Sequence, residues 1–277
     1  MLIDMHVHTR ASPGGKFTAE QLLAEAARRG LDGLCLTDVH QVEPALQARN
    51  LAKQQEPVLL VGLEALTDQG HYLVFVPHPE QLPVLDRWLR FVAEDLISFQ
   101  SLAEAVRAQQ GIIIAAHPYD RSVSDSPGDR LFQMEGLAAI EIINGSRPAL
   151  ANQLAEEMAA GMGLVGVGGS DTRSELKALG KVATLLAGAV ASEAELIERI
   201  LDGDAWAVTL GKPATRSSGR RSRGRSADRD KEKRRPRRAG APRNRVRSAN
   251  DSGDGSGRKS RNPRKRSRRR PRRGDKQ

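Results

Sequence analysis

The protein has 277 residues, 39% of them hydrophobic, and a formal net charge of +10. No segment approaches the ~20 consecutive apolar residues of a membrane span, and the N-terminus lacks the basic and apolar regions of an export signal, so neither membrane insertion nor export is expected. The single cysteine, Cys35, excludes an intrachain disulfide, and its place in an apolar run favours a reducing compartment. We therefore expect a cytoplasmic protein.

The charge divides the chain into two parts. Residues 212–277 contain 28 Lys and Arg against 6 Asp and Glu, whereas residues 1–211 contain 16 and 28. The C-terminal part has no Leu, Ile, Met, Phe, Trp or Tyr, and it cannot bury enough apolar surface to offset the entropy of ordering. We predict one folded domain over residues 1–211 and a disordered basic tail over residues 212–277.

Short apolar runs alternate with segments of helical periodicity along residues 1–211. We expect buried strands at residues 2–8, 33–38, 58–66, 72–76, 112–116, 139–143 and 164–167. Helices are expected at residues 18–29, 82–110, 148–161 and 192–201. This alternation implies parallel β-α-β units, and so many strands suit a closed barrel better than an open sheet. The predicted class is α/β.

Histidines and carboxylates gather at the ends of these predicted strands, where a barrel places its reactive groups. His6 and His8 stand two positions apart, so both imidazoles point to one side of an extended strand and can bind one divalent ion. For the pair alone, two histidines satisfied by core hydrogen bonds are the alternative. Asp171 leaves an apolar strand through two glycines, as a metal ligand or a general base at a barrel mouth would.

Glu64 lies in an otherwise apolar strand, where an unpaired carboxylate is costly to bury. A metal ion is its simplest partner, and an arginine is the alternative. A carboxylate can bridge two cations about 3.5 to 4 Å apart, so we expect His71 and His117 to complete a second ion. For His117, a loop histidine before Pro118 is the alternative.

Two more histidines complete the set of 6. His40 follows the second predicted strand, two residues after Asp38, and we count it among the candidate metal ligands. His78 lies between two prolines with no strand end or carboxylate near it, and we expect it to be a surface loop residue.

The order and spacing of these motifs resemble the polymerase and histidinol phosphatase (PHP) family. The resemblance covers residues 1 to about 210, and the motifs that carry it are Asp4-Met-His6-Val-His8-Thr9, Leu36-Thr-Asp38, Gly62-Leu-Glu64, Gly70-His71, Ala116-His117-Pro118, Glu141-Ile-Ile-Asn144-Gly145 and Gly169-Ser-Asp171. It implies a distorted (β/α)7 barrel with a metal cluster at its C-terminal mouth and hydrolysis of phosphate esters.

Carried over residue by residue, the family pattern assigns two ions to this chain. The first ion is assigned to His6, His8, Glu64 and Asp171, and the second to Glu64, His71 and His117. The pattern for a third ion is incomplete, because residues 11–15 lack an acidic residue or His, Val39 displaces His40 by one position, and Arg173 stands where a final His is usual. We therefore expect a dinuclear centre.

Arginines are expected to bind the substrate phosphate. The guanidinium of Arg173 would take the place of a third cation, a role that its planar donor fork suits, and an ion pair with Glu175 is the alternative. Arg147 is a second candidate phosphate ligand. Asp171 would position the attacking water or accept its proton. The mix of imidazole and carboxylate ligands suits Zn, Mn or Fe about equally.

The tail over residues 212–277 is expected to attract RNA or DNA through its charge. Since it has no aromatic residue to stack on bases, this binding should be indifferent to sequence. A solubilising tail without a specific partner is the alternative.

The function that these expectations favour is a metal-dependent phosphoesterase acting on phosphomonoesters or phosphodiesters, including those of nucleotides or RNA ends. Two alternatives stay open. One is a small-metabolite phosphatase of the histidinol-phosphate type, whose turnover would not depend on the tail. The other is a non-catalytic nucleic-acid-binding protein.

Overall fold

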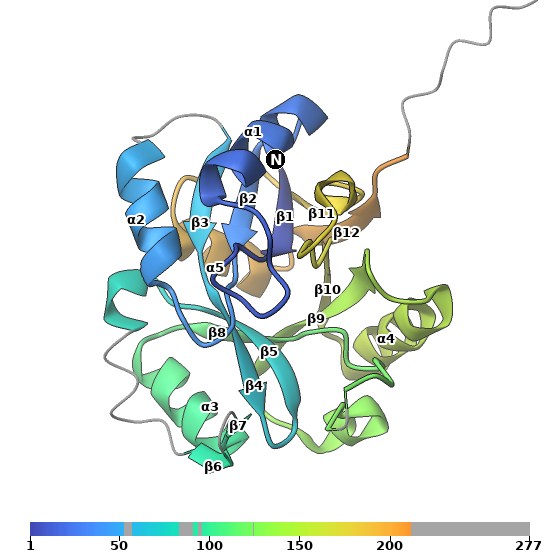
Figure 1. Ribbon diagram of the computed structural model, residues 1–277. Helices are drawn as coiled ribbons and strands as arrows, with labels where there is room; N and C mark the ends of the chain where they lie inside the picture. Colours follow the sequence, from blue (N-terminus) through green and yellow to red (C-terminus); the bar gives the residue numbers. More distant parts are fainter. Residues whose placement is uncertain (53–56, 83–90, 94–95, 124, 212–277) are drawn as a thin grey trace, which may run out of the picture. The chain divides into compact units, whose positions relative to one another are not determined.

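The computed structural model describes residues 1–52, 57–82, 91–93, 96–123 and 125–211. Its strands form two mixed sheets, and the helices lie outside them (Figure 1). The five-stranded sheet has the order β12-β11-β1-β2-β3, and the seven-stranded sheet has the order β10-β9-β8-β5-β4-β7-β6. The predicted tail lies outside the described residues.

The five-stranded sheet is built from β1 (Leu2–Val7), β2 (Gly33–Leu36), β3 (Val58–Val61), β11 (Val182–Leu186) and β12 (Ala205–Thr209). The seven-stranded sheet is built from β4 (Leu63–Thr67), β5 (Gly70–Phe75), β6 (Phe91–Ala93), β7 (Leu96–Ile97), β8 (Ile112–Ala115), β9 (Leu137–Asn144) and β10 (Val165–Gly169). The α-helices are α1 (Ala19–Arg29), α2 (Glu43–Ala52), α3 (Phe99–Ala108), α4 (Ala149–Met162) and α5 (Glu193–Leu201). Short 3-10 helices cover residues 79–82, Gly128–Gln133 and Leu176–Ala178.

Both sheets combine parallel and antiparallel pairs. Strands β1, β2 and β3 run parallel, as do β8, β9 and β10. Strand β5 pairs antiparallel with β4 and β8, and β11 pairs antiparallel with β1 and β12. The α/β class is confirmed, but the expectation of an all-parallel sheet is wrong. The (β/α)7 barrel is not confirmed, because the strands fall into two mixed sheets.

Helix α1 begins where the sequence predicts, because Thr18 caps it. The Thr18 hydroxyl accepts from the Gln21 backbone N–H at 3.3 Å, and the Gln21 side chain accepts from the Thr18 backbone N–H at 3.0 Å, which is a reciprocal capping box. Gly30 ends the helix with a φ of 74°, a left-handed conformation that glycine adopts at little cost. At α5, the Ser192 hydroxyl accepts from the Glu195 backbone N–H at 3.3 Å.

The prediction of a single helix over residues 82–110 is wrong. Among the described residues of that range, Leu82 lies in a 3-10 helix, the short strands β6 and β7 follow, and α3 begins only at Phe99, after the cap residue Ser98. Apolar residues three to four positions apart also fit short strands separated by turns, so spacing alone did not decide between them. Residues 83–90 and 94–95 lie outside the described residues. The strand expected over residues 58–66 is divided at Gly62, where the chain passes from one sheet to the other.

Backbone hydrogen bonds join the end of β1 to the segment after β10. The Asp171 N–H donates to the His6 carbonyl at 2.8 Å, and the His8 N–H donates to the Thr172 carbonyl at 3.0 Å. A Cβ atom on Gly169 would lie 2.5 Å from the Cβ of His6, so only glycine allows this approach. The approach places Asp171 beside both histidines.

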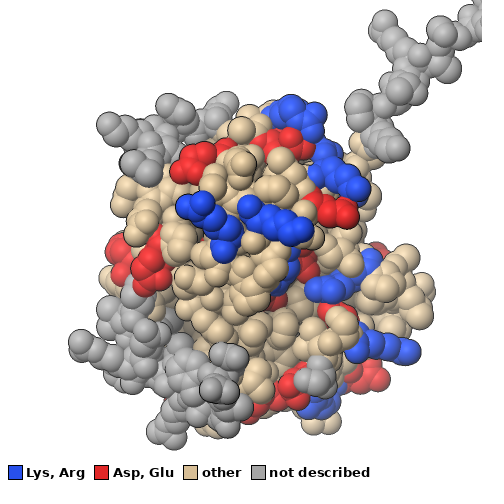
Figure 2. All heavy atoms as spheres, in the orientation of Figure 1, with Lys and Arg blue, Asp and Glu red and all other residues tan. Residues whose placement is uncertain are grey.

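The charge on the surface and the length of the helices bear on possible partners. On the face drawn in Figure 2, basic and acidic side chains are interspersed. None of the helices in the described part of the chain combines the length and the apolar composition that crossing a bilayer requires.

Candidate metal centre

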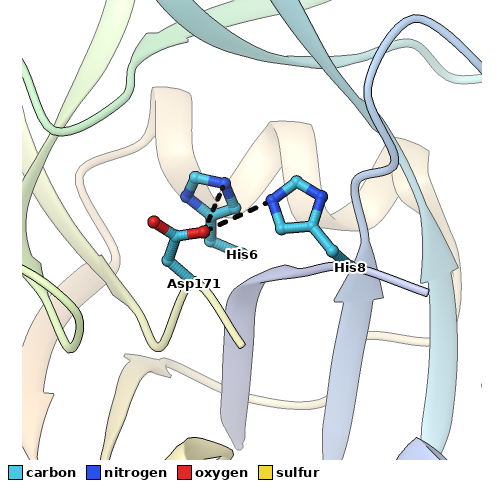
Figure 3. Close-up of side chains that lie close together, drawn as sticks. All are labelled: His6, His8 and Asp171. Atoms are coloured by element: carbon cyan, nitrogen blue, oxygen red, sulfur yellow. Dashed lines mark ion pairs between the residues drawn. The ribbon is translucent and has the colours of Figure 1, made fainter. Parts of the chain in front are cut away.

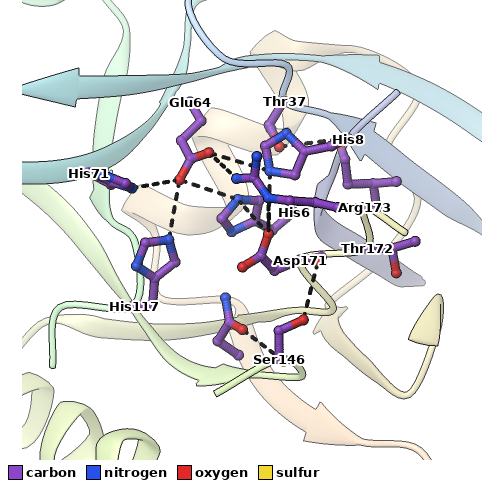
Figure 4. A network of polar contacts seen from close by, with 12 residues as sticks. His6, His8, Thr37, Glu64, His71, His117, Ser146, Asp171, Thr172 and Arg173 are labelled. Atoms are coloured by element: carbon purple, nitrogen blue, oxygen red, sulfur yellow. Dashed lines mark hydrogen bonds and ion pairs between the residues drawn. The ribbon is translucent and has the colours of Figure 1, made fainter. Parts of the chain in front are cut away.

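The six residues predicted to hold two ions lie together, although they come from segments far apart in the chain (Figure 4). Side chains alternate along β1, so Met5 packs in an apolar core cluster while His6 and His8 point into the site. Strands β4 and β5 supply Glu64 and His71. His117 comes two residues after the end of β8, and Asp171 comes two residues after the end of β10.

One group of potential ligands consists of His6, His8 and Asp171 (Figure 3). Asp171 Oδ1 lies 3.8 Å from His6 Nε2 and 3.5 Å from His8 Nε2. Both Nε2 atoms are buried, and neither has a hydrogen-bond partner among the described residues. Buried polar atoms are normally satisfied, so two such nitrogens facing one carboxylate fit a cation between them.

A second group consists of Glu64, His71 and His117. Glu64 Oε1 lies 3.1 Å from His71 Nδ1 and 3.2 Å from His117 Nε2. The other oxygen, Oε2, lies 3.4 Å from His8 Nε2. Glu64 is fully buried and reaches both groups, as the bridging role requires. The donor set of each group fits a divalent ion.

Glu141 sets the orientation of the His6 ring. Glu141 Oε1 lies 3.1 Å from His6 Nδ1, and its Oε2 accepts from the backbone N–H of His117 at 2.9 Å and from Asn144 Nδ2 at 3.0 Å. A carboxylate only accepts, so His6 Nδ1 carries a proton, and in the neutral ring the lone pair of Nε2 faces the site. This is the arrangement found behind many metal-binding histidines.

Ser12 and Asp38 set the orientation of the His8 ring. Asp38 Oδ1 accepts from the Ser12 hydroxyl at 2.6 Å, and Asp38 also accepts from the backbone N–H of Thr9 at 2.8 Å. Because the single hydroxyl proton of Ser12 goes to Asp38, the Ser12 oxygen accepts from His8 Nδ1, which lies 3.0 Å away. The lone pair of His8 Nε2 therefore also faces the site.

Two arginines contact the ligand carboxylates. Arg173 Nε donates to Asp171 Oδ1 at 2.9 Å, and its terminal nitrogen pairs with Glu64 Oε2. Arg147 pairs with Asp171 Oδ2 at 2.8 Å and with Asp120 Oδ2 at 3.0 Å. The alternative prediction for Arg173 is an ion pair with Glu175. In the described structure Arg173 pairs with Glu64 and Asp171, and Glu175 pairs with Lys177.

These contacts keep the carboxylates ionised. Burial alone would raise the pKa of Asp171, but the charge of His6, contact with His8 and the charge of Arg173 hold that pKa well below its usual range. The pKa of Glu64 is also lowered against the effect of burial, by contacts with His117, His6 and His71. Burial alone would lower the pKa of His6, but the carboxylates of Glu141 and Asp171 raise that pKa above its usual range. Because metal ligation requires deprotonated imidazole, a bound cation would take the place of the proton on the site-facing nitrogen of His6.

The remaining histidines divide as follows. His78 is exposed, which confirms a surface position. The backbone N–H of His40 donates to the Glu64 carbonyl at 3.0 Å, but His40 belongs to none of the three ligand groups found among the described residues. Its role as a metal ligand stays a prediction.

Glu141 was not predicted as part of the site, although it forms a third potential ligand group with His6 and His117. The signal was present, because Glu141 interrupts an apolar strand as Glu64 does. Ser12 gave no signal of this kind, since its contact with Asp38 joins residues 26 positions apart.

Comparisons with known proteins give a consistent result. Residues 4–124 match the PHP domain and residues 149–205 match the PHP-associated family. The uncharacterized protein MJ1587 of Methanocaldococcus jannaschii is 25% identical over 169 residues, which make up 56% of this chain and 89% of that protein.

Two solved structures share the fold. A two-domain protein from Bacteroides vulgatus, described as containing a predicted PHP-like metal-dependent phosphoesterase, aligns with a TM-score of 0.57 and 17% identity over 76% of this chain and 64% of that chain. PsfC from Pseudomonas syringae aligns with a TM-score of 0.54 and 16% identity over 76% of this chain and 91% of that chain.

The matched segments contain all six predicted ligands. Five of the six predicted ligands, from His6 to His117, lie within residues 4–124, and Asp171 lies within residues 149–205. The motif order, the family matches and the shared fold agree: the chain belongs to the PHP family.

Proposed function

We propose that the protein is a metal-dependent phosphoesterase with a dinuclear centre. The observation that carries this proposal is the pair of buried Nε2 atoms of His6 and His8, which lack hydrogen-bond partners among the described residues and face the carboxylates of Glu64 and Asp171. One ion would be held by His6, His8, Glu64 and Asp171, and the other by Glu64, His71 and His117.

Divalent ions bound there would lower the pKa of a water molecule and neutralise charge on phosphate oxygens. Zn, Mn and Fe all suit this donor set. The two arginines would bind the phosphate. Arg173 contacts Asp171 Oδ1 and Arg147 contacts Asp171 Oδ2, so the two guanidinium groups lie on either side of this carboxylate, next to the place where the phosphate would bind. Their side chains are 25% and 22% exposed, so their guanidinium groups can meet a substrate at the mouth of the site.

Asp171 would position the attacking water or accept its proton. Its backbone has a φ of 50°, an uncommon conformation for a residue other than glycine and one that concentrates at functional sites. The hydrogen bond from its N–H to the His6 carbonyl fixes the backbone. Asp171 is thus held in place independently of its side-chain contacts.

The Asp171→Ala substitution tests this proposal. The variant should fold normally and lose turnover of a generic aryl phosphate by more than about 1,000-fold, since it lacks both a ligand and the group that acts on water. Asp202→Ala, which changes an exposed aspartate at the end of α5, is the matched control. Retained turnover in purified, folded Asp171→Ala protein would refute the mechanism.

We further propose that residues 212–277 hold RNA or DNA near this site, so that the ester is part of a nucleotide or an RNA end. The charge of these residues, 28 Lys and Arg against 6 Asp and Glu, supports this proposal. A small-metabolite phosphatase is the competing enzyme, and it would not need the tail. The non-catalytic alternative is less well supported, because all six ligands are present and lie together.

A further inference from the structure

A cavity of about 400 Å³ lies beside the metal centre. The residues around it belong to the segment after β8, the segment after β9 and the first turns of α4. They include Tyr119, Asp120, Ser146, Arg147, Ala151 and Leu154. Its volume lies within the range of about 300 to 1,000 Å³ that is typical of small-molecule sites.

The cavity shares residues with the metal centre. Arg147 lines the cavity and pairs with Asp171 at 2.8 Å, and Asp120 lines the cavity and pairs with Arg147 at 3.0 Å. The Ser146 hydroxyl donates to the Asp171 carbonyl at 3.2 Å. A phosphate at the metal centre would therefore have the cavity on its Arg147 side.

The two sides of the cavity differ in chemistry. Toward the metal centre the cavity is polar, because Asp120, Ser146 and Arg147 line it there and the Arg147 side chain is 22% exposed. Away from the metal centre its lining includes the apolar side chains of Ala151 and Leu154 on α4 and the ring of Tyr119. The Tyr119 hydroxyl donates to Asp129 at 2.7 Å, which holds that ring in place.

We propose that this cavity binds the leaving group of the phosphate ester, and that this group is a ring-bearing alcohol. The inference rests on the proposed phosphoesterase function and names the class of ester. A planar ring can pack against Tyr119 and the apolar face of α4, while its ester oxygen lies next to Arg147. A small, fully polar alcohol would leave the apolar lining in water.

Hydrolysis would release the ring-bearing alcohol into this cavity. The bond between phosphorus and the ester oxygen breaks as a bond forms between phosphorus and the oxygen of water. The attacking water gives up one proton, the electron pair of the broken bond stays on the ester oxygen, and this oxygen takes up one proton from solvent, so the protons balance. The guanidinium of Arg147 stabilises the negative charge that develops on this oxygen.

The Ala151→Leu substitution tests the proposal by filling the cavity without altering a ligand or an arginine. With the metal-loaded protein, kcat/KM is measured for 1-naphthyl phosphate and for glycerol 3-phosphate. We expect the ratio of the two values to fall by about tenfold or more, because an overfilled apolar pocket excludes the larger group. An unchanged ratio in the folded variant would overturn the proposal.

Ala103→Leu is the matched control. Ala103 is also a half-buried helical alanine, but it lines a different cavity, beside α3, so the ratio should stay at the wild-type value. If Ala151→Leu does not fold, Ala151→Met replaces it, because a methionine side chain adapts more easily to its surroundings.

A binding measurement separates this proposal from the proposed function. Calorimetry with the metal-loaded protein compares 1-naphthylmethylphosphonate with methylphosphonate, neither of which is hydrolysed. We expect the naphthyl compound to bind at least about tenfold more tightly to the wild type, and Ala151→Leu to remove this preference. If no ester is hydrolysed but the preference is found, the phosphoesterase function fails and the cavity assignment stands. If wild-type protein shows no preference, the cavity assignment is wrong.

Discussion

Glu64 is the residue on which the centre depends most. One buried carboxylate contacts four imidazoles and a guanidinium, those of His6, His8, His71, His117 and Arg173. Without a positive partner, a buried carboxylate of this kind would be strongly unfavourable. Its several contacts account for its lowered pKa and for its expected place between two ions.

Glu64→Gln should therefore remove metal from both positions. The substitution keeps the shape of the side chain but removes its charge, so we expect metal content to fall to less than half of the wild-type value, with turnover reduced by more than about 100-fold. Elemental analysis of dialysed protein measures the metal content. Glu175→Gln, at an exposed ion pair with Lys177, is the control, and equal metal content in both variants would contradict the bridging role.

Ser12→Ala tests the orientation of His8. Without the hydroxyl, His8 Nδ1 loses the acceptor that fixes its proton, and metal affinity should fall by about 10- to 100-fold. The measurement is competition against a chelator of known affinity. Ser192→Ala, which removes the cap of α5, should lower the free energy of unfolding by about 1 kcal/mol and leave metal affinity unchanged. Unaltered affinity in Ser12→Ala would mean that Ser12 does not orient the ring.

At the scale of elements, the centre depends on how closely β10 approaches β1. Gly169 makes this possible, because any side chain there meets His6. The sequence showed two glycines before Asp171, and their flexibility suggested a ligand leaving a strand. The close backbone approach could not be predicted, because it depends on the pairing of segments more than 160 residues apart.

Gly169→Ala should separate the two segments. We expect a loss of about 1 to 3 kcal/mol in the free energy of unfolding, the usual range for overpacking, and a loss of metal affinity because Asp171 moves away from His6 and His8. Chemical denaturation and chelator competition measure the two effects. Gly211→Ala, where a Cβ would meet nothing within 4 Å, should change neither. Wild-type stability and affinity in Gly169→Ala would show that the approach is not required.

Strand β1, which carries His6, was predicted as one strand. Strands β4 and β5, which carry Glu64 and His71, were predicted only in part, since residues 58–66 were expected to form one strand and residues 72–76 another. Strands β11 and β12 and helix α2 were not predicted. Their short apolar stretches carry no chemical signal, and such runs do not distinguish strand from helix. Antiparallel pairing of β4 with β5 was missed for a related reason, because sequence alternation does not specify strand direction. The six residues of the candidate centre could be named from the sequence, and the structure places them together. The residues behind them, such as Glu141 and Ser12, depend on tertiary contacts.

At the scale of the whole molecule, the charge is divided between the two parts of the sequence. Residues 1–211 have an excess of acidic residues and residues 212–277 have a large excess of basic ones. A strongly basic segment of this kind attracts polyanions in a salt-dependent way, through the release of counterions. The six residues of the candidate metal centre all belong to the first part.

Removal of residues 212–277 should separate binding from chemistry. We expect affinity for single-stranded RNA, measured by fluorescence anisotropy across a series of salt concentrations, to fall by more than about 100-fold at low salt, and its salt dependence to become shallow. Turnover of a small aryl phosphate should stay within about twofold of the full chain. Undiminished RNA affinity in the truncated protein would assign nucleic-acid binding to residues 1–211 instead.

The most direct test of the central claim combines metal content with turnover in the full-length protein. Elemental analysis after reconstitution with Zn, Mn or Fe should find about two ions per chain, and the same sample should hydrolyse a generic aryl phosphate, with activity lost on chelation and restored by metal. Protein that is folded but retains no metal and hydrolyses no phosphate ester after reconstitution would contradict the account of this site as a dinuclear phosphoesterase centre.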